Sequence, residues 1–147
     1  MRSWRIASLV PALLMMAACT GAAQGRAPSQ PGGAAPAATV ERFLRLAADK
    51  NYVQMGYVFG TREGPIIRRD PESQVQRRMF AIASILENQR FVIRGEQPIP
   101  GRIGEAVQLT VQITQRGQAR DVPFVVVKGG DRWYVEQIDL EKITRTN

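Results

Sequence analysis

The sequence contains no histidine and only one cysteine among its 147 residues. Without histidine there is no Ser-His-Asp or Cys-His relay, no imidazole base near neutral pH, and no histidine-rich zinc or iron site. A single cysteine excludes an intramolecular disulfide and a paired-thiolate metal site. The sequence also lacks a phosphate-binding glycine loop, a dinucleotide fingerprint and an acidic metal-binding run. We therefore expect no cofactor and no metal, and we assign no catalytic residue.

A dense run of basic residues is also missing, although the formal net charge is +7. Arginine supplies 17 of the 20 basic residues, and they are scattered along the chain. The densest groups are the pairs Arg68-Arg69 and Arg77-Arg78. A basic nucleic-acid-binding segment has about five to eight clustered Lys or Arg residues. We therefore expect no nucleic acid among the partners.

The first 19 residues have the order of an export signal. Arg2 and Arg5 are followed by the uncharged, apolar residues 6–16 and then by small residues that end at Cys19. The apolar run is too short for a transmembrane helix, which needs roughly 20 residues. This order predicts a signal peptide over residues 1–19.

The segment Met16-Ala17-Ala18-Cys19 resembles the lipobox of bacterial lipoproteins, although Met16 stands where Leu is usual. The resemblance implies that Cys19 becomes the first mature residue and carries acyl chains, so that the membrane is a partner. Thr20 in place of Asp implies, by the same resemblance, sorting to the periplasmic side of the outer membrane of a Gram-negative bacterium. The alternative is an ordinary signal peptide, cut after Ala23, which leaves a soluble exported protein.

Residues 20–39 are almost entirely Ala, Gly, Pro, Gln and Ser, with one charge. Because this segment contains no large apolar residue, it has nothing to bury. We predict that it is a flexible tether, and that residues 40–147 form a single domain.

The domain begins with helical patterns. Apolar residues at helical spacing from Val40 predict a first helix with Thr39 as its cap, and a short second helix follows at residues 52–59. Residues 60–70 contain glycine and proline and predict a loop. A third helix is predicted from Asp70 as cap and Pro71 as first residue, with an apolar stripe at Val75, Met79, Ile82, Ala83 and Leu86.

After residue 87 the apolar pattern alternates, which predicts strands at residues 90–95, 106–114, 119–128 and 132–140. Pro123 favours a position at a sheet edge or a bulge. In the last strand the alternation changes phase between Val135 and Ile138, which predicts a β-bulge. The fold class is therefore α+β, with three N-terminal helices packed on a curved antiparallel sheet of about four strands.

Three segments are typical of one known fold: Val40-Glu41-Arg42-Phe43-Leu44, Asp49-Lys50-Asn51-Tyr52, and Trp133-Tyr134-Val135 with Ile138-Asp139. With them, residues 40–140 resemble the NTF2-like superfamily, which has a cystatin-like α+β cone. The resemblance implies a cavity between the helices and the sheet. Members of the superfamily use such a cavity for isomerase or cyclase chemistry or for ligand binding, and some dimerise through the sheet.

The resemblance makes Tyr52, Tyr57, Phe80, Trp133 and Glu136 the candidate pocket residues. Glu136 is the acid of interest, because a bulge can re-aim a side chain into a cavity. The alternatives are that Glu136 is a solvated surface carboxylate and that the aromatic residues only pack in the core.

Arg62, Arg68 and Arg69 could bind an anionic ligand or lipid head groups, or they belong to an ordinary exposed loop.

We favour a membrane-anchored envelope lipoprotein with a non-enzymatic domain that binds a protein partner or a small apolar ligand. The alternative is an isomerase or cyclase that uses an acid in the cavity. A further hypothesis is a homodimer formed through the outer face of the sheet.

Overall fold

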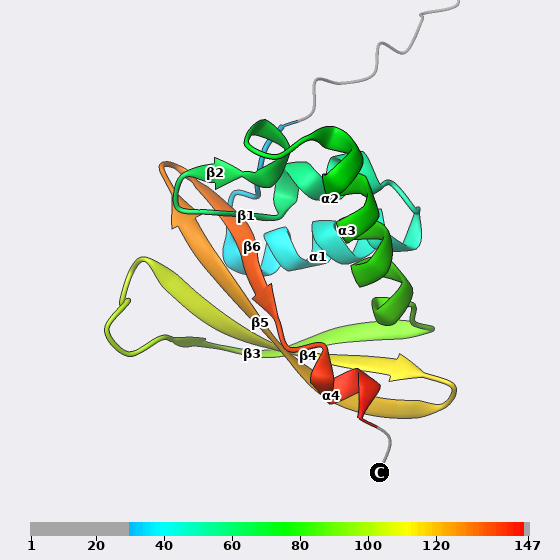
Figure 1. Ribbon diagram of the computed structural model, residues 1–147. Helices are drawn as coiled ribbons and strands as arrows, with labels where there is room; N and C mark the ends of the chain where they lie inside the picture. Colours follow the sequence, from blue (N-terminus) through cyan, green and yellow to red (C-terminus); the bar gives the residue numbers. More distant parts are fainter. Residues whose placement is uncertain (1–29, 146–147) are drawn as a thin grey trace, which may run out of the picture.

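The computed structural model describes residues 30–145 of the chain. Four antiparallel strands in the order β3-β4-β5-β6 form the main sheet, and helices pack on one of its faces (Figure 1), which confirms the α+β class. The helices are α1 (Pro36–Ala48), α2 (Tyr52–Val58), the 3-10 helix η1 (Ile66–Arg68), α3 (Glu72–Leu86) and α4 (Glu141–Thr144). The strands are β1 (Gly60–Thr61), β2 (Gly64–Pro65), β3 (Arg90–Pro98), β4 (Ala106–Gln115), β5 (Gln118–Gly129) and β6 (Arg132–Ile138).

Helix α1 begins earlier than the apolar pattern predicted. Its first residue is Pro36, whose fixed φ suits the first helical position. Thr39 is therefore not the cap: it is fully buried inside the helix, and its Oγ1 donates a hydrogen bond of 2.7 Å to the Ala35 carbonyl. A run of small residues has no apolar periodicity, so the sequence did not reveal this first turn.

The chain before α1 is bonded to the domain, although composition assigned it to the tether. The Gly32 amide donates to the Tyr57 carbonyl at 2.8 Å, and Gly33 exchanges two backbone hydrogen bonds with Trp133 at 2.8 and 2.9 Å. A Cβ on Gly33 would collide with the side chain of Thr39. Glycine is therefore required at Gly33 by close packing.

Helix α3, in contrast, begins one residue later than predicted. Its first residue is Glu72 and Pro71 occupies the cap position, while the Asp70 carboxylate accepts a 3.5 Å hydrogen bond from Arg69 Nε instead of capping the helix. The preceding segment, predicted as a loop, contains the β1–β2 hairpin and η1. The apolar stripe of α3 is confirmed, with four buried residues, Val75, Met79, Ala83 and Leu86.

The strand pattern agrees with the sequence at several residues. Leu109, Val111 and Ile113 of β4 are buried. Val125 pairs with Gln137 and Val126 pairs with Val135, so that Glu136 is an extra residue in β6. The predicted bulge is confirmed.

Pro123 lies in β5, an inner strand, but the pairing of β5 with β6 ends at Phe124 and Ile138. The missing N–H of Pro123 therefore faces no β6 ladder, which explains how proline fits there. A second register shift, at Arg94 in β3, and helix α4 were not predicted.

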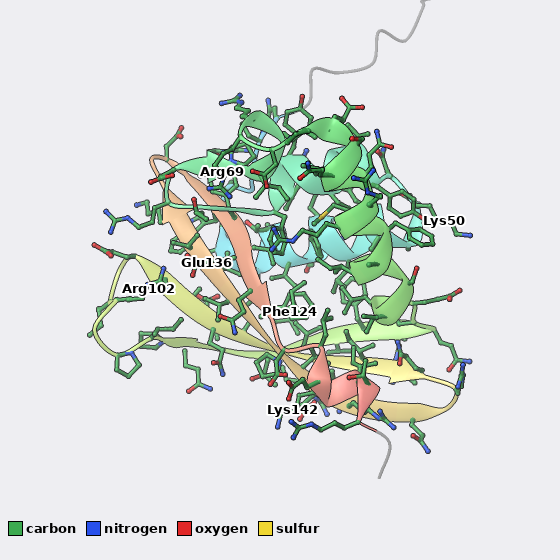
Figure 2. The ribbon with its side chains drawn as sticks, viewed as in Figure 1. Lys50, Arg69, Arg102, Phe124, Glu136 and Lys142 are labelled. Carbon is green, nitrogen blue, oxygen red and sulfur yellow. The ribbon has the colours of Figure 1, made fainter. Side chains whose placement is uncertain are left out.

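Apolar side chains fill the space between the helices and the sheet. The largest buried residues are less than 2 % exposed and come from α1, α2, η1, α3, β4 and β5: Phe43, Leu44, Met55, Ile66, Met79, Leu86, Leu109, Ile113 and Phe124. Figure 2 shows Phe124 pointing from the sheet toward the helical layer. A contiguous core of this kind supplies most of the free energy that favours folding.

We expect Gly33→Ala to lower the free energy of unfolding by about 1–3 kcal/mol, because the new methyl group overpacks the contact with Thr39. The matched control is Gly95→Ala, where nothing lies within 4 Å of the added Cβ. That change should stay within about 0.5 kcal/mol. Urea unfolding of both variants measures the difference, and equal stabilities would show that residues 32–33 are not packed as described.

Candidate functional site

A surface groove lies between the end of α1, the start of α2 and the second half of α3. Its volume is about 270 Å³, and we call it the α1–α3 groove. It is lined by residues of these helices and of the segments beside them: Ala47, Ala48, Lys50, Tyr52, Phe80, Ala83, Ser84, Leu86, Glu87 and Asn88. The volume is slightly below the usual range of small-molecule pockets, about 300–1,000 Å³. The groove therefore has room for a single side chain or a similarly small group.

Tyr52 and Phe80 meet in this groove, so the structure brings together two of the five candidate pocket residues. Their ring centroids are 5.6 Å apart with an interplanar angle of 88°, an edge-to-face arrangement that aromatic pairs prefer. Phe80 is nevertheless 55 % exposed, which is unusual for a large apolar side chain. The exposed part of the ring is available for a partner.

The turn between α1 and α2 positions Tyr52. Lys50 has φ of 55°, a left-handed conformation that ends α1, and the Asn51 side chain then caps α2 by accepting the Gln54 amide at 3.3 Å. Phe80 comes from α3, next to the buried Met79, and therefore lies off the buried stripe. The lining carries one cation, Lys50, and one anion, Glu87, so the groove has no excess of either charge.

Tyr57 and Trp133 lie away from the groove lining, and their backbones hold residues 32–33. The side chain of Trp133 packs partly buried against the core. Neither residue joins Tyr52 and Phe80.

Glu136 is bound by an arginine that the sequence did not single out. Its carboxylate accepts two hydrogen bonds from Arg102, at 2.8 and 3.2 Å, a bidentate pair between β6 and the β3–β4 loop (Figure 2). The hydrogen bond to Glu136 raises the pKa of Arg102 above its ordinary value. The bulge therefore aims this carboxylate at the loop. Arg102 and Glu136 are 34 residues apart in the sequence, and only the fold brings them together.

The interior of the described domain is apolar. Within residues 30–145, Thr39 is the one polar residue classed as buried, and every buried side-chain nitrogen or oxygen atom there has a hydrogen-bond partner. The same residues contain no group of three or more metal-ligating side chains, and none of their helices is both long and apolar enough to cross a bilayer.

Cys19, the predicted lipid attachment residue, lies outside the described residues. Comparisons with protein-family models, with curated proteins and with solved structures gave no match for this chain.

Neighbouring residues of α3 allow a test of the groove. We expect Phe80→Ala to change the free energy of unfolding by less than about 1 kcal/mol, because more than half of the side chain is already in water. Met79→Ala, one residue earlier and fully buried, should cost about 2–5 kcal/mol. Thermal or urea unfolding compares the two, and a similar cost for Phe80 would mean that it belongs to the core.

Proposed function

We propose that this chain is an exported lipoprotein, anchored through Cys19 at the periplasmic side of the outer membrane of a Gram-negative bacterium. Its domain is of the NTF2-like type and binds an apolar side chain of a partner protein in the α1–α3 groove. The observation that carries the binding function is the half-exposed Phe80 beside Tyr52, in a domain whose interior is already filled.

The order of the elements supports the NTF2-like type. Helices α1, α2 and α3 precede the sheet in the chain, and β3 to β6 are neighbours in chain order. The bulge at Glu136 adds local twist and bends the last strand.

The filled core supports binding at the surface over binding in an internal cavity. Phe43, Met55 and Phe124 occupy the space between helices and sheet where a ligand would otherwise lie. A small apolar molecule is the alternative occupant of the groove. The isomerase or cyclase alternative would use the carboxylate of Glu136 as its acid. That carboxylate is paired with Arg102, which argues against this alternative. A homodimer through the outer sheet face stays a prediction.

Metabolic labelling with a palmitate analogue tests the anchor. We expect label on the wild-type chain and on Thr20→Ala, and none on Cys19→Ala, because acyl chains require the thiol. Cys19→Ala should also be lost from the outer-membrane fraction. An unlabelled wild-type chain, or unchanged fractionation of the Cys19→Ala chain, would reject the anchor.

Photo-crosslinking tests the groove. A benzoylphenylalanine at position 80 should give one discrete product with a partner protein in intact cells. The control position is Ile103, which is 79 % exposed at the β3–β4 loop and lies outside the groove. Identical products at both positions, or none at position 80, would reject a protein partner. If the purified chain instead carries an apolar small molecule that Phe80→Ala loses, the occupant is that molecule.

A further inference from the structure

The described chain begins on the side of the molecule that carries the helices. Arg42 Nη1 donates to the Gly32 carbonyl at 2.6 Å, and Arg132 Nε donates to the Pro31 carbonyl at 3.0 Å. Burial lowers the pKa of Arg42 below its ordinary value, and the nearby charge of Arg132 adds to this effect. Figure 1 shows this start at the end of the molecule opposite the C-terminus. Two arginines therefore hold the point at which the chain leaves the domain.

The β1–β2 turn lies next to this point. A Cβ on Gly129 would lie 2.8 Å from the Arg62 carbonyl, and Gly129 pairs with Arg132, which holds Pro31. Arg69 Nη1 donates to Thr61 Oγ1 at 3.5 Å, so η1 and the start of α3 are on the same side. Figure 2 places Arg69 beside the β1–β2 hairpin.

The first half of the described domain, which contains this start, has an excess of positive charge. Residues 30–86 contain eight basic and five acidic residues, whereas residues 87–145 contain nine basic and eight acidic residues. Two acids, Glu63 and Asp70, lie within 3.9 and 3.5 Å of Arg69 and neutralise it. Glu105 lies 3.7 Å from Arg62 and compensates the charge of that arginine. Arg68 and Arg77 are exposed, and no acidic residue of the described chain forms an ion pair with either.

The distance to the anchor is short. Gln30 follows Cys19 by eleven residues, and eleven fully extended residues span at most about 40 Å. The domain therefore stays within about one or two domain diameters of a membrane that holds Cys19. At that range the side on which the chain leaves the domain is the side that meets the bilayer most often.

We propose that the exposed surface that carries Arg68 and Arg77 binds the phosphate groups of an anionic lipid membrane. This proposal rests on the proposed anchor, because the anchor keeps the domain close to the bilayer. The uncompensated charges of Arg68 and Arg77 carry most of the attraction, each raising the binding constant by about five-fold near an anionic surface. The surface orients the domain, with its helical layer toward the lipid.

Sedimentation with vesicles tests the surface. The chain from Thr20 onward carries no lipid and keeps every residue that the structure describes. We expect it to bind vesicles that contain phosphatidylglycerol, not vesicles of phosphatidylcholine alone, and to be released as salt screens the charges. Arg68→Gln with Arg77→Gln should weaken binding by about ten-fold or more.

The matched control removes the same charge from the far edge of the sheet. Arg90→Gln with Arg94→Gln changes two exposed residues of β3, the edge strand farthest from β6. This pair should weaken binding by less than about two-fold, because its charges lie far from the lipid. Equal weakening by both pairs would show that only net charge matters and would overturn the proposal.

Two other outcomes would also overturn it. One is a wild-type chain that does not bind the anionic vesicles. The other is release by inorganic phosphate at an ionic strength where chloride has no effect, which would indicate a site for free phosphate. Because this chain has no lipid, a negative result leaves the labelling of Cys19 intact, and the two failures are distinguishable.

Discussion

The close contact between residues 32–33 and the start of β6 is the constraint on which the rest of the structure depends. Gly33 exchanges two backbone hydrogen bonds with Trp133, and Pro36 begins α1 three residues later. The position of α1 then directs Val40 and Phe43 into the core. Since a helix is rigid, the same contact determines where the other end of α1 meets α2 and α3 at the groove. It also determines the side on which the chain leaves the domain.

The side chains that we propose for partner binding and membrane binding lie outside the hydrophobic core. Met79 is buried while Phe80, the next residue, is half exposed. Arg77 lies on the same helix, also outside the buried stripe. A helix that packs one face on its neighbours leaves the other face free to vary, and α3 packs on α1 and α2. It can therefore carry a groove on one flank and positive charge on its outer side. The helical layer therefore combines the proposed partner site and the proposed membrane surface.

Some features were predictable because they depend on neighbours in the chain. The phase change between Val135 and Ile138 located the bulge, since alternation in a strand is a local property. Other features were missed for equally physical reasons. The first turn of α1 consists of small residues without apolar periodicity. Asp70 is a residue type that often caps helices, but in the structure Pro71 occupies the cap position of α3. Glu136 was identified at the bulge, but its partner Arg102 comes from a distant loop with no local signal.

By itself the sequence determined the α+β class, the buried faces of α3 and β4, and the chemistry that the absence of histidine excludes. Periodicity and composition suffice for these properties, because each depends on residues close together in the chain. Only the tertiary structure decided that Tyr52 meets Phe80 while Tyr57 and Trp133 do not, and that Glu136 faces Arg102. A groove is formed by the packing of elements distant in sequence, so the residue pattern of any single element does not predict it.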